Sequence, residues 1–291
     1  MKFQLFTGAF LFFLLGSAAA AELNINALKV ACAQIDVTDD PLINTAKILS
    51  FIDKAASQDV QIVLFPETAL SGYAPYHFID KPIPGKEVLE SGLEKVCKKA
   101  AETGVHVVLG TSSYENGGVY NIVYYIDGSG EIIGSHDKTH GTGGKYYLKG
   151  REVRTFETQG MKFGMQVCYD ARFPEAWRMQ ALEGADVIFH VSHAAGGGAW
   201  KTPVWEAHVR SRAAENGIWV VSCNVSGPIQ AGKSYIVSPR GLMMAESNQE
   251  VEEMITAVID LSEAKRGILY SRRKDIYRVA PMESSEPEQA P

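Results

Sequence analysis

The stretch Lys162–Arg178, KFGMQVCYDARFPEAWR, decides the fold of this chain. Its first part, up to Val167, is apolar enough to be a buried strand. Pro174 suits the first turn of a helix, where no amide proton is needed, and Glu175 favours the same positive helix end. Cys168 is therefore expected at the tip of a strand, just before a helix N-terminus. That position lowers the pKa of a thiol, so Cys168 is a candidate nucleophile rather than an ordinary core cysteine.

Two other expected strands end at residues that a thiol nucleophile needs. The β-branched run at 62–65 leads to Glu67, a carboxylate that can take up the thiol proton. The run at 131–137 leads to Lys138, a cation that can stabilise an oxyanion. Taken singly, Glu67 reads as a turn residue and Lys138 as a surface charge. Because reactive residues collect beyond the strand ends of α/β sheets, the three together predict one site.

At these positions the chain resembles the carbon–nitrogen hydrolase family, also called the nitrilase superfamily, over residues 28–278. The matching segments are VACAQ at 30–34, FPETALSGY at 65–73, HDKTH at 136–140, CYDARFPE at 168–175, RAAEN at 212–216, GKS at 232–234 and RRKDIY at 272–277. The resemblance implies a catalytic triad, which it carries onto Glu67, Lys138 and Cys168. It also implies a four-layer α-β-β-α sandwich, a homodimer or larger dimer-based assembly joined through helices, and catalysis without metal or organic cofactor.

The N-terminal residues 1–21 have the pattern of a secretory signal peptide: a positive start at Lys2, a short apolar run and small residues before the expected cut. Removing Lys2 with this segment takes the formal net charge from −6 to −7. That mild acidity argues against nucleic acid and anionic membrane surfaces as partners. We therefore expect an exported protein, periplasmic or secreted, that is not held in a membrane after signal cleavage.

The remaining chain alternates between strand and helix patterns, which indicates one α/β domain over residues 22–282. Strands are expected at 29–35, 62–65, 105–110, 120–126, 131–137, 152–158, 161–167, 187–192, 219–224, 234–238, 242–246 and 253–260. Helices are expected at 41–56, 88–103, 173–183, 205–215 and 261–269. The acidic tail, 283–291, is expected to be disordered. Cys32 and Cys223 are expected in the core, and an export route permits a disulfide without demanding one.

Three residues near the triad are expected to contact the substrate. Tyr73 lies in an aromatic loop, 68–84, that either lines a pocket above Glu67 or is an ordinary surface loop. Tyr169 follows the nucleophile, and a backbone amide near it is expected to help stabilise the oxyanion. His193 opens a loop whose three glycines, at 196–198, leave room for a ligand.

The residues after the nucleophile distinguish the branches of the family. True nitrilases tend to have Trp-Glu there, whereas Tyr169-Asp170 followed by Arg172 is similar to the amidase, ω-amidase and carbamoylase branches. Arg172 either binds a substrate carboxylate bidentately or pairs with a structural carboxylate such as Asp170 or Glu175. The reaction implied is hydrolysis of a small-molecule amide or N-carbamoyl group through a Cys thioester, with release of ammonia or an amine.

One departure from the family pattern leaves a second function open. Members carry another glutamate between the lysine and the cysteine, and Gly143 stands at that place here. Lys138 would then be held by another group, such as Glu152, Tyr146 or Tyr147. The alternative function is a catalytically altered binding protein that kept the fold.

Two further classes are disfavoured by the sequence. A thiol redox protein would need a resolving cysteine near Cys168, and none is present. A zinc hydrolase would use a set of histidines whose spacing suits a helix only in part, and glycines at 141, 143 and 144 argue against that helix. The histidines concerned are His136, His140, His190 and His193.

Overall fold

The computed structural model describes residues 22–115, 117–141, 145–196, 198–277 and 279. The predicted signal peptide, Gly143 and the acidic tail lie outside these residues, so the expectations about them stay predictions. No helix within the described ranges is long and apolar enough to cross a membrane.

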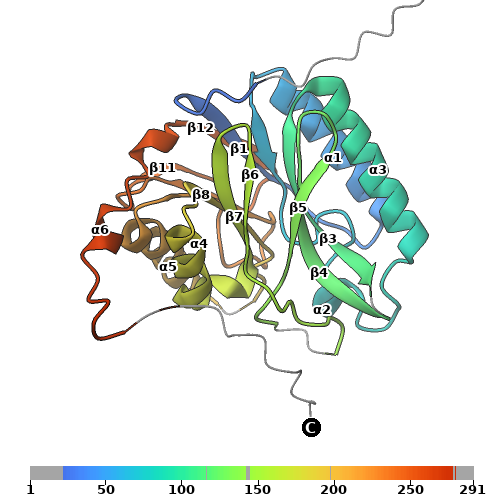
Figure 1. Cartoon of the computed structure of the whole chain (residues 1–291). Helices are drawn as coiled ribbons and strands as arrows, with labels where there is room; N and C mark the ends of the chain where they lie inside the picture. The colour runs from blue at the N-terminus through green and yellow to red at the C-terminus, as the bar shows by residue number, and fades with distance from the viewer. Residues whose placement is uncertain (1–21, 116, 142–144, 197, 278, 280–291) are drawn as a thin grey trace, which may run out of the picture.

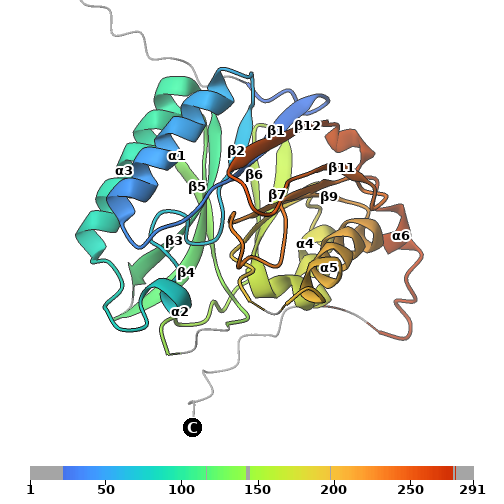
Figure 2. The same ribbon diagram turned by 180° about the vertical axis from the view of Figure 1, so that it is seen from behind.

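Two sheets pack face to face between two layers of helices, as Figures 1 and 2 show from opposite sides. The first sheet has the order β12 (Glu253–Ile259), β1 (Leu28–Gln34), β2 (Ile62–Leu64), β3 (His106–Glu115), β4 (Gly118–Ile126) and β5 (Ile132–Asp137). The second has the order β11 (Met243–Glu246), β10 (Tyr235–Val237), β9 (Trp219–Asn224), β8 (Val187–Ser192), β7 (Met161–Val167) and β6 (Thr155–Thr158). Helices α1 (Pro41–Ala56) and α3 (Lys86–Thr103) cover the first sheet, and α4 (Pro174–Leu182) and α5 (Lys201–Asn216) cover the second. The predicted α-β-β-α sandwich is confirmed.

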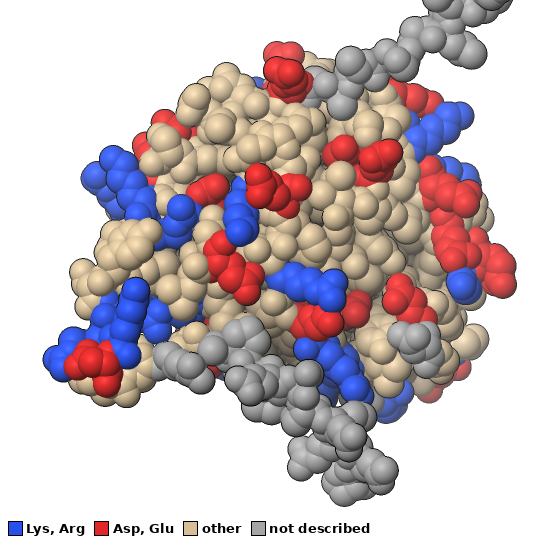
Figure 3. All heavy atoms as spheres, in the orientation of Figure 1, with Lys and Arg blue, Asp and Glu red and all other residues tan. Residues whose placement is uncertain are grey.

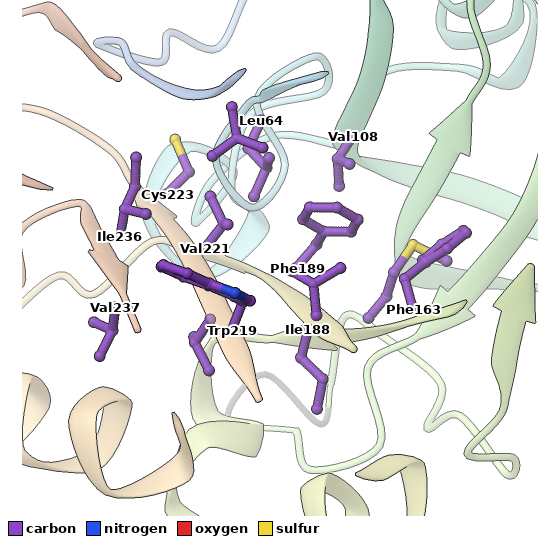
Figure 4. Packing of buried hydrophobic residues seen from close by; sticks show 14 of the residues in the cluster. Leu64, Val108, Phe163, Ile188, Phe189, Trp219, Val221, Cys223, Ile236 and Val237 are labelled. Atoms are coloured by element: carbon purple, nitrogen blue, oxygen red, sulfur yellow. The ribbon is translucent and has the colours of Figure 1, made fainter. Parts of the chain in front are cut away.

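Side-chain alternation along the strands divides the buried residues between two cores. In β1, Val30 and Cys32 pack against the second sheet, whereas Ala31 and Ala33 pack with residues of α1 and α3. Figure 4 shows part of the larger cluster, in which strands of both sheets contribute apolar side chains. The inner strands of each sheet are thus buried on both faces, which accounts for their nearly continuous apolar sequences.

The pairing pattern places the ends of several strands at one edge. Strands β1, β2 and β3 pair in parallel, as do β7, β8 and β9. β5 also runs parallel to β3, because β4 pairs antiparallel with both. The residues that follow β2, β5, β7 and β8 therefore come together, and these residues include all three triad candidates.

Several predicted elements match the structure and others do not. The helix at 41–56 is confirmed, and the Asp40 side chain caps it by accepting a hydrogen bond from the Leu42 amide at 2.8 Å. The strand expected at 152–158 is shorter, Thr155–Thr158. The single helix expected at 261–269 is wrong: η2 (Leu261–Glu263) and α6 (Gly267–Tyr270) are separate, because Arg266 between them adopts a left-handed φ of 48°.

Candidate active site

Glu67, Lys138 and Cys168 meet between the two sheets at this common edge. Lys138 Nζ donates a hydrogen bond to Glu67 Oε1 at 2.7 Å, and the Cys168 thiol hydrogen-bonds the same carboxyl group. The three residues are 0%, 4% and 7% exposed, respectively. Glu67 and Lys138 come from one sheet and Cys168 from the other. The three side chains therefore meet only because the two sheets pack face to face.

Both oxygens of the Glu67 carboxylate have further partners. Asn121 Nδ2 donates to Oε1 at 2.7 Å, and the His193 backbone amide donates to Oε2 at 2.8 Å. Burial raises the pKa of Glu67, but the Lys138 charge and the bonds from Lys138 and Cys168 outweigh it, so the pKa is lowered. Glu67 is therefore a carboxylate at neutral pH. Sequence reasoning missed Asn121, whose signal was a polar residue inside an otherwise apolar strand.

Cys168 begins a short 3-10 helix, Cys168–Arg172, with a left-handed φ of 47°. A non-glycine residue at such a φ is strained, and this strain is common at functional sites. Its carbonyl accepts a hydrogen bond from His190 Nε2 at 3.1 Å, while His190 Nδ1 lies 2.8 Å from Ser222 Oγ. Burial lowers the pKa of His190 to about 4, so its neutral ring holds the strained turn without adding charge.

The expectation of a lowered thiol pKa is wrong. Burial and the nearby Glu67 charge raise the pKa of Cys168 to about 12, against the opposing effect of Lys138. The α-helix that was expected to lower the pKa begins only at Pro174, beyond the 3-10 turn. The thiol is therefore protonated at rest and depends on Glu67 to lose its proton.

Asp170 ties the turn after Cys168 to the turn after Lys138. Its buried carboxylate accepts hydrogen bonds from the backbone amides of Val167 at 3.1 Å and His140 at 2.8 Å, and from Thr139 Oγ1 at 2.9 Å. Burial raises the pKa of Asp170, but the nearby His136 ring and the hydrogen bonds from His140 lower it well below its usual range. The carboxylate therefore stays charged and fixes both turns.

The histidines do not form a metal site. His136 and His140 both lie against Asp170, with their ring nitrogens 3.7 and 2.8 Å from its oxygens, whereas His190 contacts Ser222. The His193 ring stacks on Tyr73 with 4.7 Å between centroids. Within the described ranges no group of three His, Cys, Asp or Glu residues could hold a metal ion.

A cavity of about 320 Å³ opens above Cys168. All four predicted substrate-contact residues line it, together with Lys201, which sequence reasoning missed. The lining residues are Tyr73, Cys168, Tyr169, Arg172, His193, Ala195, Gly196, Trp200, Lys201 and Trp205. This set contains two cations and no carboxylate.

Several buried polar atoms at this cavity have no hydrogen-bond partner among the residues that the structure describes. They are Arg172 Nε, Trp205 Nε1 and both ring nitrogens of His193. The Arg172 guanidinium lies 5.4 Å from the centre of the Tyr169 ring and forms no ion pair with Asp170 or Glu175. The structural-carboxylate alternative for Arg172 is therefore wrong, because Asp170 is engaged by the turn around His140.

The groups that the sequence suggested as extra partners of Lys138 are engaged elsewhere. Glu152 is exposed and pairs with Arg154. The Tyr147 hydroxyl accepts a bond from the Ala74 amide at 3.2 Å and lies 3.2 Å from Ser112 Oγ. Among the described carboxylates only Glu67 lies within 4.0 Å of the Lys138 ammonium.

Tyr73 and Tyr146 complete the surroundings of this lysine. The Tyr73 ring centre is 5.9 Å from Lys138 Nζ. Tyr146 instead lies beside Lys145, whose ammonium is 4.7 Å from its ring centre. The suggestions of Glu152, Tyr146 and Tyr147 as holders of Lys138 are therefore wrong, and the Tyr73 ring face supports the ammonium.

The fold and this cluster define a class of protein: an α-β-β-α sandwich that buries a cysteine, a glutamate and a lysine beneath a cavity. Comparison with known proteins gives the family. Residues 29–267 match the carbon–nitrogen hydrolase profile, and the chain belongs to that family. It is accordingly an enzyme of the carbon–nitrogen hydrolase class.

Known relatives span nearly the same length. The chain is 32% identical to a 2-oxoglutaramate amidase of Bacillus subtilis, covering 85% of this chain and 98% of that protein. It is 27% identical to an N-carbamoylputrescine amidase of Solanum lycopersicum, covering 86% and 93%. A solved variant of the Nesterenkonia AN1 amidase from the nitrilase superfamily superposes with a TM-score of 0.74 at 23% identity, covering 88% and 97%. This last likeness concerns the fold.

Proposed function

We propose that this protein hydrolyses a small-molecule amide or N-carbamoyl compound through a thioester on Cys168. The observation that carries the proposal is the buried contact of Glu67 with both Lys138 and Cys168 at the base of a 320 Å³ cavity. The two sequence relatives above are named as an amidase of a small oxo acid amide and as a carbamoyl amidase. Both names describe cleavage of a C–N bond outside a peptide chain.

The first half of the reaction transfers the acyl group to sulfur. Because the pKa of the Cys168 thiol is about 12, Glu67 takes the thiol proton as the sulfur attacks the carbonyl carbon. The Lys138 ammonium, with a backbone amide near Tyr169, stabilises the oxyanion. Glu67 then passes its proton to the leaving nitrogen, and ammonia or an amine departs.

The second half restores the enzyme. Glu67, again a carboxylate, removes a proton from water as the water oxygen attacks the thioester carbonyl. The carbon–sulfur bond breaks, the acid product leaves, and the sulfur regains a proton from Glu67. In the resting enzyme Lys138 is charged: burial lowers its pKa, but Glu67, Cys168 and Tyr73 together outweigh that effect and raise the pKa above its ordinary value.

The cavity favours a substrate that carries a carboxylate at a distance from its scissile group. Arg172 and Lys201 supply two positive charges, and none of the lining residues is acidic. Arg172 Nε is buried and has no hydrogen-bond partner within the described part of the chain, which costs free energy unless a bound ligand accepts its hydrogen bond. A neutral or cationic amide would leave both positive charges uncompensated, whereas a substrate carboxylate would pair with them.

An ammonia-release screen tests this function. ω-Amides of dicarboxylic acids and N-carbamoyl amino acids should release ammonia, and simple neutral amides should react more slowly. Cys168→Ala should release none while keeping the circular dichroism spectrum of the parent. Full activity in Cys168→Ala would refute the mechanism. Absence of ammonia release by the parent protein from every compound would favour the binding-protein alternative.

We also propose that the protein is exported and forms a homodimer. The signal-peptide pattern of residues 1–21 supports export. Exposed apolar side chains on α6, at Ile268 and Tyr270, support association through the helical layers. Acidic and basic side chains are interspersed over the face in Figure 3, which agrees with a small-molecule substrate rather than nucleic acid.

A further inference from the structure

The two sheets approach each other closely where Cys32 of β1 faces Cys223 of β9. The Cys32 Sγ donates to the Ser222 carbonyl at 3.5 Å, and the Cys223 Sγ donates to the Ala33 carbonyl at 3.4 Å. Each thiol thus reaches the main chain next to the other cysteine. Cα atoms of β1 and β9 come within 8 Å of each other, whereas packed sheets usually lie about 10 Å apart.

Both thiols are enclosed by the core that joins the sheets. Cys32 and Cys223 are each 0% exposed and belong to the same apolar cluster, and Figure 4 shows the Cys223 side chain within it. Burial, and then the side-chain interaction with the neighbouring Cys223 thiol, raise the pKa of Cys32 well above its ordinary value. The two sulfur atoms are therefore direct neighbours, each a free thiol in this structure.

We propose that Cys32 and Cys223 form a disulfide that joins the two sheets when the chain folds in an oxidising compartment. A disulfide joins Cα atoms roughly 4.4–6.8 Å apart, and the close approach of β1 and β9 brings Cα atoms of the two strands within 8 Å of each other. Both cysteines sit on interior strands of their sheets, so the bond would connect the two sheets through their shared core.

The oxidant is a second disulfide, either a thiol–disulfide oxidoreductase or oxidised glutathione. The thiolate of one cysteine attacks that disulfide, which forms a mixed disulfide and expels one thiol. The thiolate of the other cysteine then attacks the protein sulfur, forms the Cys32–Cys223 bond and expels the second thiol. Two protons and two electrons leave the protein. Because both side chains end fully buried, the exchange takes place before the sheets finish docking.

The other two cysteines are separated from this pair. Cys97 lies half-buried on α3, in the layer outside the first sheet. Cys168 hydrogen-bonds Glu67 at the edge of the sandwich. The fold therefore pairs the two core thiols and leaves the nucleophile free in an oxidising environment.

Refolding in a glutathione redox buffer tests the pairing. The chain is unfolded and reduced, refolded with reduced and oxidised glutathione, and mapped by mass spectrometry without reduction. We expect a peptide pair linked through Cys32 and Cys223, and two free thiols by titration in denaturant instead of four. Four free thiols, or a link that includes Cys97 or Cys168, would overturn the proposal.

A stability measurement gives a second, independent reading. Reductant should lower the melting temperature of the oxidised protein by roughly 5–10 °C, as loss of a long-range disulfide does in a domain of this size. The double variant Cys32→Ala, Cys223→Ala should show no such shift, whereas Cys97→Ser should show the full one. An equal shift in the double variant would refute the link. If that variant does not fold, the peptide map decides alone.

Discussion

At the scale of single residues, two charges act in opposite directions on one thiol. Beyond the effect of burial, which is the largest, the Glu67 charge raises the pKa of Cys168 and the Lys138 charge lowers it. Reactivity therefore depends on transfer of the proton to a neighbouring carboxylate rather than on a thiolate that exists at rest. This arrangement protects the nucleophile from chance alkylation and oxidation, because the thiolate is the reactive form.

Loss of either charged partner should disable the nucleophile. Glu67→Gln removes the base and Lys138→Met the oxyanion donor, so each should lower kcat at least about a hundredfold in an ammonia assay. Lys138→Met should also slow alkylation of Cys168 by iodoacetamide at pH 8, because the pKa of the thiol rises without the ammonium. Lys98→Met, on the exposed face of α3, serves as the control. Activity within tenfold of the parent for either variant would remove that residue from the mechanism.

The cavity cations should govern affinity rather than chemistry. Lys201→Met should raise KM for a carboxylate-bearing amide about tenfold or more, with a smaller change in kcat, since it removes a charge-assisted contact to the distal group. Arg172→Met should act in the same direction. A neutral amide of similar size is the matched control and should be unaffected. An equal rise in KM for both compounds would show a packing effect instead.

How far the sequence reaches differs from residue to residue. Glu67, Lys138, Cys168 and Arg172 stand in motifs at strand ends, so their convergence could be predicted. Lys201 could not be, because it reaches the cavity only through the path of the loop before α5, where its ammonium bonds the Ala195 and Gly196 carbonyls at 2.9 and 3.3 Å. The raised pKa of the Cys168 thiol could not be predicted from the sequence, because its main cause is burial, which arises only when the two sheets assemble.

At the scale of elements, β3 fits against the turn that carries Glu67 because Gly110 has no side chain. A Cβ at Gly110 would lie 2.2 Å from the Pro66 carbonyl oxygen and 2.8 Å from the Glu67 Cα. Strands 187–192 and 219–224 match their predictions residue for residue, since both are rich in apolar residues and every position in them is buried. The break at Arg266 escaped prediction, because no proline or glycine marks that residue itself.

Gly110→Ala should displace the catalytic carboxylate. The added methyl group cannot be accommodated without moving backbone, so we expect a loss of stability of about 1–3 kcal/mol and a drop in kcat of at least tenfold. Denaturant unfolding and the ammonia assay measure the two effects. Gly267→Ala is the control, because nothing lies within 4 Å of a Cβ built there. Parent-like activity in Gly110→Ala would mean that the turn can shift freely.

The buried Asp170 carboxylate, which holds the turns after Lys138 and Cys168, should make the free energy of unfolding depend on pH. Its folded-state pKa lies below the ordinary value of 3.8, so its contribution is present above that value and is lost as pH falls below it. Asp170→Asn should lower the free energy of unfolding at pH 7 by about 2–4 kcal/mol, and the difference from the parent should shrink below pH 4. The exposed Asp275→Asn should change nothing measurable. A difference that persists unchanged at pH 3 would contradict the charge argument.

At the scale of the whole molecule, the outer helices determine which surface is free for association. If the protein is a homodimer as proposed, light scattering should give twice the 31.8 kDa chain mass, less any residues cleaved from each N-terminus. Ile268→Glu changes an exposed side chain on α6 and should shift the measured mass toward that of the monomer. Leu42→Glu changes an exposed side chain on α1 and should leave the mass unchanged. A monomer mass for the parent, or dissociation by Leu42→Glu alone, would contradict an interface at α6.

The active site draws Glu67 and Lys138 from one sheet and Cys168 and His193 from the other, so neither half contains it. A chain that has formed its strands but not yet brought the sheets together has a thiol of ordinary reactivity and no base beside it. Recovery of enzymatic activity therefore reports on the docking of the two sheets, which is the last step of folding. In a refolding experiment, ammonia release should return only after the far-ultraviolet circular dichroism signal has recovered. The lag between the two signals measures the time that the two sheets need to dock.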